Sequence, residues 1–151
     1  MIRIRKALPE DSIKIIEYQI NFAQETENLS LNKTELQKGV EFIFNNPTVG
    51  QYYVAVYDMK VVGFCLTLNE WSDWRNGRVI WVDTIYVDSE HRGMGVSKEL
   101  IKKVKEVVAQ SFEYKGVRLY INKDNIHAQR LFESLDMNAN HYKLYEWLKK
   151  D

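Results

Sequence analysis

The residues from Trp81 to Ser97 have types and spacing that could bind a phosphorylated ligand. An apolar, β-type run ends at Val87, two glycines follow at Gly93 and Gly95, and a long amphipathic helix is predicted directly after them. Glycines let the backbone approach a ligand closely, and a helix N-terminus directs several unpaired N–H groups at an anion. This arrangement predicts a diphosphate-binding loop.

Two common classes of phosphate loop are excluded by residues that are missing. A mononucleotide-binding loop ends in Gly-Lys-Ser/Thr, whereas the residues after Gly95 are Val-Ser-Lys. A dinucleotide fingerprint requires a third glycine where Lys98 stands, and an acid at the end of the next strand, which here ends in Asn122.

Two carboxylates are candidate general bases. Asp83 lies inside an otherwise apolar strand, where an unpaired carboxylate would be costly. Glu70 ends a predicted strand and opens the segment Glu-Trp-Ser-Asp-Trp-Arg-Asn-Gly, which we interpret as a loop. Tryptophans with acids between them suit a cationic amine. The alternatives are a structural role for Asp83 and a packed loop in which Asp73 pairs with Arg75.

The elements that would position these residues follow from hydrophobic periodicity and turn signals. Asn32 is a predicted N-cap, with Glu35 three residues later in a capping-box pattern. The expected strands are 2–5, 51–57, 61–68, 79–87, 117–121 and 141–148, and the expected helices are 9–20, 33–44, 96–108 and 125–135.

Composition limits the class of protein. The 151 residues predict a single domain, 1–151, and a net charge of zero gives no indication of a nucleic-acid or membrane partner. One cysteine, no signal-peptide pattern and no long apolar run lead us to expect a cytoplasmic protein. Cys65 is expected to be a buried, inert thiol, and the three histidines lack metal-ligand spacing, so no metal site is predicted.

Two motifs and the element order together resemble the GNAT superfamily of N-acetyltransferases. Arg92-x-x-Gly95-x-Ser97 is similar to the family's acetyl-coenzyme A loop, Gln/Arg-x-x-Gly-x-Gly/Ala, with Ser97 as a mild departure. Asn125-x-x-Ala128-x-x-Leu-Phe132 is similar to a second segment, Asn-x-x-Ala-x-x-Leu-Tyr. Phe132 replaces a tyrosine that many members use to protonate the departing thiolate; Tyr120, Tyr142 and Tyr145 are candidate replacements.

The resemblance implies the GNAT acyl-CoA N-acyltransferase fold, an α/β (α+β) architecture with a mixed central sheet and the order β-α-α-β-β-β-α-β-α-β. It also implies that pantetheine pairs with the backbone of the third long strand and that loop amides hold the pyrophosphate. The expected acetyl-CoA contacts are Ile85, Tyr86, Val87, Arg92, Gly93, Met94, Gly95, Val96, Ser97, Asn125 and Ala128.

The activity that the resemblance implies is acetyl transfer from acetyl-CoA to a primary amine of a small or amino-acid-like acceptor, by direct attack in a ternary complex. An amine with a pKa near 10.4 is neutral in only about one molecule in 2,500 at pH 7, which is why a base such as Asp83 or Glu70 is expected. Val87 is the expected backbone donor to the carbonyl oxygen. The acceptor-site candidates are Glu25, Glu27, Trp71, Asp73 and Trp74, in two segments expected to border one cleft.

Three alternatives stay open at this point. The first is a protein acceptor, either a lysine side chain or an N-terminus. The second is an acyl-CoA-binding regulatory module of the same fold that has lost turnover, for which Phe132 is the motivating residue. The third concerns assembly: the family resemblance makes a homodimer an expectation, and nothing in the residues themselves decides it.

Overall fold

The computed structural model of this chain describes residues 1–150. Its first compact unit is Met1–Leu119, and a second begins at Tyr120. In chain order the elements are β1 (Arg3–Lys6), η1 (Pro9–Asp11), α1 (Ser12–Glu27), α2 (Lys33–Asn45), β2 (Gly50–Tyr57), β3 (Lys60–Ser72), β4 (Gly77–Val87), η2 (Ser89–His91), α3 (Val96–Ala109), β5 (Tyr114–Leu119) and α4 (Ile126–Ser134).

The central sheet has the spatial order β1-β2-β3-β4-β5. Strands β1 to β4 are antiparallel to their neighbours, and β5 is parallel to β4 after the α3 crossover. The β2–β3 turn has positive φ at both Asp58 (49°) and Met59 (64°), as a two-residue type I′ hairpin requires. The mixed sheet predicted from the sequence is confirmed.

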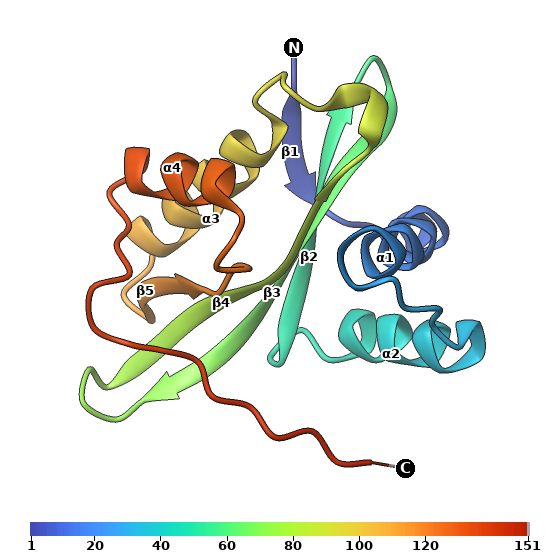
Figure 1. Cartoon of the computed structure of the whole chain (residues 1–151). Helices are drawn as coiled ribbons and strands as arrows, with labels where there is room; N and C mark the ends of the chain where they lie inside the picture. The colour runs from blue at the N-terminus through green and yellow to red at the C-terminus, as the bar shows by residue number, and fades with distance from the viewer. Residues whose placement is uncertain (151) are drawn as a thin grey trace. The chain divides into compact units, whose positions relative to one another are not determined.

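Helices cover both faces of the sheet in the first unit, with α1 and α2 on one side and α3 on the other (Figure 1). Because β2 and β3 are covered on both sides, their side chains are buried in near-continuous runs. The core under α1 and α2 consists of Ala7, Ile15, Tyr18, Val40, Ile43, Tyr52, Val54, Phe64, Leu66 and Tyr86. The buried side chains of α3 are Val96, Leu100, Ile101 and Val104.

Local capping signals in the sequence are confirmed by the structure. The Asn32 side-chain oxygen accepts a hydrogen bond from the Glu35 backbone N–H at 3.0 Å, so α2 begins where the capping pattern predicted. In the described residues 1–150, no helix has the length and hydropathy that a membrane span requires.

Three expected boundaries are wrong. Residues 141–148 form no strand, because an apolar alternation needs a neighbouring strand to accept its backbone hydrogen bonds. The strand expected at 117–121 lies at Tyr114–Leu119, so Gly116 is inside it. The Glu70–Gly77 segment is not a loop: β3 continues to Ser72, which pairs with Gly77, and only 73–76 form the turn.

Candidate active site

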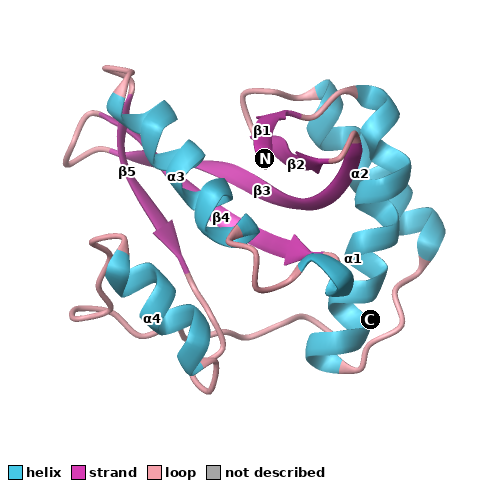
Figure 2. Ribbon diagram, turned by 90° about the horizontal axis from the view of Figure 1, so that it is seen from above, coloured by secondary structure: helices cyan, strands magenta, loops and turns pink. Residues whose placement is uncertain are grey.

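A bulge in β4 opens one edge of the sheet. Leu66 of β3 pairs with Thr84 and the next residue, Thr67, pairs with Val82, so Asp83 is an extra residue in β4. Bulges bend a strand and increase its twist. The β4–β5 ladder ends at the same level, with Val82 opposite Leu119, and the two strands then diverge (Figure 2). In the described chain, residues 83–87 of β4 therefore have no strand neighbour on the β5 side.

The hydrogen-bond pattern shows which backbone groups point to this open edge. The Asp88 N–H donates to the Val62 carbonyl at 2.8 Å, which makes the Val87–Gly63 pair a non-hydrogen-bonded one in the antiparallel ladder. The backbone groups of Val87, and of Ile85 two residues earlier, therefore face away from β3. Tyr86, between them, directs its N–H and C=O to β3. Of the three residues predicted to pair with pantetheine, Ile85 directs both backbone groups and Val87 its N–H to the open edge, while the Val87 carbonyl accepts a hydrogen bond from Arg92.

The loop that follows β4 has the conformation that its glycines permit. Gly93 and Gly95 have φ of 80° and 84°, in the left-handed region, and an added Cβ at either would meet no atom within 4 Å. Gly95 is the N-cap of α3, and no side chain caps this helix end. The first backbone N–H groups of α3 are therefore available for an anion, which favours the predicted pyrophosphate position.

The Arg92 side chain makes contacts that the sequence did not predict. Its Nε donates to the Val87 carbonyl oxygen at 2.9 Å, and its Nη2 donates to Glu25 Oε1 at 2.8 Å. The guanidinium also lies 5.3 Å from the centre of the Tyr86 ring, in cation–π geometry. The side chain thus joins the end of α1 to the end of β4. Any contact of Arg92 with a pyrophosphate is left to its backbone N–H.

Glu25 and Tyr86 complete this cluster, which we call the Arg92 clamp (Glu25, Tyr86 and Arg92). The Tyr86 hydroxyl donates to Glu25 Oε2 at 2.5 Å. The hydrogen bond from Tyr86, together with Arg92, holds the pKa of Glu25 below its usual value. Burial and the same hydrogen bond raise the pKa of Tyr86 to about 12. Glu25 is thus a charged carboxylate held by two donors, and its role in positioning was not visible in the sequence.

Asp83 lies at the bulge, where the open edge begins. It is half-buried. Burial and the nearby Asp83 charge raise the pKa of Tyr52, a core residue under α1 and α2, to about 12. The Asp83 charge therefore lies near enough to Tyr52 to act on its hydroxyl. The role of Asp83 as a general base stays a prediction.

Glu70, the second candidate base, is engaged in an ion pair. Its Oε2 lies 2.9 Å from Nη1 of Arg118 on β5. The ion pair orients the Glu70 side chain toward β5.

The remaining acceptor candidates do not gather around one point. Trp71 and Trp74 are 61% and 86% exposed at the tip of the β3–β4 hairpin, with Asp73 in the turn, and Glu27 is exposed at the end of α1. Glu70 pairs with Val79, whereas Glu25 bonds to Tyr86, seven residues further along β4. Seven residues of strand correspond to roughly 23 Å. The structure thus separates the two segments that were expected to border one cleft.

The second unit contains the other predicted acetyl-CoA contacts. Asn125 caps α4, its side-chain oxygen accepting from the Ala128 N–H at 3.0 Å. Phe132 is a buried residue of α4. The capping role accounts for Asn125 structurally and leaves its amide nitrogen for other contacts.

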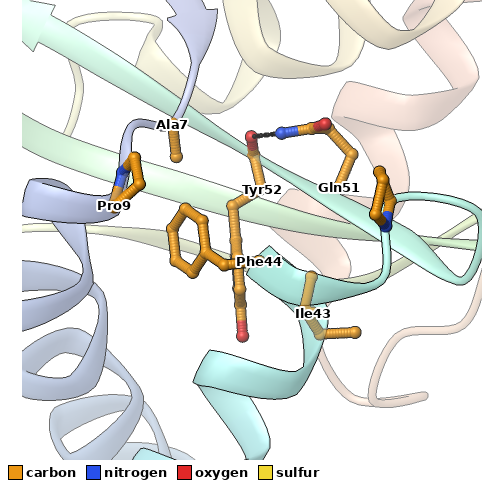
Figure 3. Close-up of a pocket in the computed structure, with 7 residues that line it drawn as sticks. Ala7, Pro9, Ile43, Phe44, Gln51 and Tyr52 are labelled. Carbon is orange, nitrogen blue, oxygen red and sulfur yellow. Dashed lines mark hydrogen bonds between the residues drawn. The ribbon is translucent and has the colours of Figure 1, made fainter.

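A small cavity of about 190 Å³ lies at the start of β2 (Figure 3). Most of its lining residues are apolar in type, and the Gln51 side-chain nitrogen donates to the Tyr52 carbonyl oxygen at 2.8 Å. None of the residues predicted for the site lines it. The lining residues are Ala7, Pro9, Ile43, Phe44, Pro47, Gln51 and Tyr52.

Comparison with known proteins agrees with this geometry. A possible acetyltransferase of Clostridium difficile 630 has a solved structure that is 36% identical, with a TM-score of 0.90, over 100% of this chain and 99% of that one. The spermine/spermidine N(1)-acetyltransferase of Bacillus subtilis (strain 168) is 33% identical over 95 residues, and the thialysine N-epsilon-acetyltransferase of Bos taurus is 38% identical over 78 residues. These matches cover 59% and 50% of this chain, but only 62% and 43% of those enzymes. The model of the acetyltransferase (GNAT) family matches residues 16–137, and the chain therefore belongs to that family.

Proposed function

We propose that the chain is an acetyl-CoA-dependent N-acetyltransferase that moves an acetyl group to a primary amine of a small-molecule or amino-acid-like acceptor. The observation that carries this proposal is the combination of an open strand edge at Ile85 and Val87 with an uncapped helix N-terminus directly after it. The named relatives acetylate spermine, spermidine and thialysine, all of which are amines. These acceptors support an amine substrate for this chain as well.

The residues present fit the donor substrate. Backbone groups of Ile85 and Val87 can pair with the amides of the pantetheine arm as an added strand would. The amides at the start of α3 can hold the pyrophosphate, and the open space around Gly93 and Gly95 admits it. Acetyl-CoA, when bound, supplies an acetyl group as an activated thioester.

Within this site we assign two tasks to the chain. The Val87 N–H faces the open edge and would stabilise negative charge on the carbonyl oxygen during attack. Asp83 would accept a proton, directly or through water, so that the amine attacks in its neutral form. The C–N bond forms and the C–S bond breaks. The second proton of the amine nitrogen passes, directly or through water, to the leaving thiolate, whose ordinary pKa near 8.5 makes a dedicated acid unnecessary. Direct attack in a ternary complex needs no covalent enzyme intermediate, and Phe132 is compatible with it.

A second candidate function is acyl-CoA binding without turnover. The observation that favours it is the buried Phe132, which has no hydroxyl to protonate a departing thiolate. Both functions predict that acetyl-CoA stabilises the fold. They differ in whether an amine-dependent release of coenzyme A exists.

The test is coenzyme A release from acetyl-CoA across a panel of polyamines, amino acids, other small amines and short peptides. We expect saturable, amine-dependent release that falls by about 10²–10⁴-fold in kcat/KM in Asp83→Asn, the range for loss of a general base. Glu70→Gln should have a smaller effect because Glu70 is paired with Arg118. Asp58→Asn is the matched control, since it makes the same change in the distant β2–β3 turn, where φ is 49°.

Three outcomes would redirect the proposal. Thermal stabilisation by acetyl-CoA with no turnover on any acceptor would favour the binding module. Neither stabilisation nor turnover would refute the assignment of the β4 edge and the α3 N-terminus as a donor site. Turnover that Asp83→Asn leaves intact would keep the enzyme and remove Asp83 as the base.

A further inference from the structure

An ion pair crosses the central sheet beside the open edge of β4. Glu70 lies on β3 and Arg118 on β5, with β4 between them, and Glu70 Oε2 is 2.9 Å from Arg118 Nη1. Neighbouring strands are about 4.8 Å apart, so the two side chains together span roughly 10 Å of sheet. Because the side chains meet, both lie on the same face of the sheet. We call this ion pair the β3–β5 strap.

The strap crosses β4 at a position that the strand register defines. Glu70 pairs with Val79 in the β3–β4 ladder, and Arg118 pairs with Trp81 in the β4–β5 ladder. Directly paired residues of neighbouring strands share a face of the sheet. The register therefore places Val79 and Trp81 on the face that the strap crosses, and Val79 is buried there.

The strap lies where the β4–β5 ladder ends. The pair of Trp81 with Arg118 is followed by the pair of Val82 with Leu119, which is the last one in the ladder. The next residue of β4 is Asp83, the extra residue of the bulge. The end of this ladder therefore decides where the open edge of β4 begins.

The end strand β5 is held less firmly than the strand to which the strap connects it. In the described residues 1–150, the one strand neighbour of β5 is β4, and the last residues of such a strand can separate from the sheet by local unfolding. In contrast, β3 is paired with both β2 and β4, and its middle is buried. The ion pair thus attaches the end of β5 to the interior of the sheet.

We propose that Glu70 and Arg118 are positioning residues that fix the end of the β4–β5 ladder and so keep residues 83–87 of β4 open for acetyl-CoA. This inference rests on the proposed function, which assigns acetyl-CoA to that edge. The Arg92 clamp lies at the other end of the edge, at Val87, so the strap and the clamp bracket it. In this arrangement Glu70 acts through Arg118 and β5, and it removes no proton from the acceptor.

The experiment combines isothermal titration calorimetry with acetyl-CoA and steady-state kinetics. Glu70→Gln and Arg118→Gln should each raise the Kd and the KM for acetyl-CoA about 1.5- to 5-fold with kcat nearly unchanged, the size expected for one partly exposed ion pair. Glu70→Arg, which places two like charges together, should raise the Kd further. The swapped pair, Glu70→Arg with Arg118→Glu, should return the Kd close to its native value. A general base at Glu70 predicts instead a loss of kcat that the swap does not restore.

Glu113→Gln is the matched control. Glu113 lies directly before β5, and its Oε1 is 2.7 Å from Nη1 of Arg78 on β4. This variant removes the same kind of ion pair at the opposite end of the same strand, so the Kd for acetyl-CoA should not change. Circular dichroism and thermal melts should show that every variant is folded.

Hydrogen exchange without ligand gives a measurement that does not depend on activity. The backbone amides of 117–119 should exchange faster in Glu70→Gln than in the native protein, and Glu113→Gln should leave them unchanged. Unchanged exchange at 117–119, or an unchanged Kd in both glutamine variants, would overturn the proposal, as would a swapped pair that binds as weakly as Glu70→Arg. A native protein that does not bind acetyl-CoA at all is a different result, and it would refute the proposed function itself.

Discussion

Replacing Gly95 by alanine is the most direct test of the proposed acetyl-CoA loop, residues 92–97, which we call the donor loop. Gly95 has φ of 84° and ψ of 18°, and it is the N-cap from which α3 begins. A left-handed conformation costs an L-residue roughly 1–2 kcal/mol relative to glycine. An added Cβ would meet no atom within 4 Å, so the penalty arises from the backbone alone.

The variant has two ways to respond, and each has a measurable consequence. If the loop keeps its conformation, the free energy of unfolding falls by about 1–2 kcal/mol, which lowers Tm by about 2–8 °C in a chain of this length. If Gly95 relaxes to negative φ, stability is retained but the first amides of α3 change direction. Loss of one hydrogen bond to a charged group, worth about 1.5–3 kcal/mol, would then weaken acetyl-CoA binding about 10–150-fold.

Gly39→Ala is the matched control for this experiment. Gly39 is an exposed residue within α2, and a Cβ there also meets nothing within 4 Å. The same substitution should stabilise the protein by about 1 kcal/mol through helix propensity and leave acetyl-CoA affinity unchanged. Thermal melts and isothermal titration calorimetry measure both quantities. A Gly95→Ala protein with native Tm and native affinity would refute the argument that this loop needs a left-handed residue to form the donor site.

Three further predictions concern the Arg92 clamp and the thiol. Arg92→Ala removes the contact with the Val87 carbonyl and should raise the KM for acetyl-CoA severalfold. Arg92→Lys should bring the KM only part of the way back to the native value, because a lysine lacks the planar fork that bridges Val87 and Glu25. An unchanged KM in both variants would show that the clamp does not position the β4 edge. The pKa of Glu25 is lowered in the folded state, so its contribution to stability is present above the ordinary carboxyl pKa and is lost as pH falls through the folded pKa. Glu25→Gln should therefore make Tm fall less steeply at acid pH than it does in the native protein. Burial raises the pKa of the Cys65 thiol to about 12, so a thiol reagent should label it only on unfolding, and labelling at the rate of a free thiol in the native state would contradict the buried position.

Features set by neighbouring residues in the chain were predictable. The α2 cap depends on Asn32 and Glu35, three positions apart, and the left-handed turn before α3 depends on Gly93 and Gly95. Such interactions form over a few residues, so residue type and spacing determine them. The order of elements up to α4 was predictable for the same reason, since each has its own periodicity and turn signals.

Features that depend on distant contacts required the structure. The bulge at Asp83 is visible only in the register between β3 and β4, and it decides which backbone groups of β4 face the open edge. The contacts of the Arg92 side chain were not predictable, because its partner, Glu25, lies 67 residues away in sequence. Trp71 and Trp74 were assigned to the acceptor cleft because nothing local in the sequence indicates that β3 continues to Ser72. That continuation places the tip of the β3–β4 hairpin far from Tyr86.

The sequence by itself therefore determined the family, the glycine-containing turn before α3 and most of the elements of the sheet, because these follow from local residue types and spacing. The tertiary structure alone decided the register of β4, the clamp that fixes its end and the absence of a strand at 141–148. Each of these depends on which strand or side chain arrives from elsewhere in the chain, and hydrogen-bond pairing between distant segments leaves no periodic signal in either one.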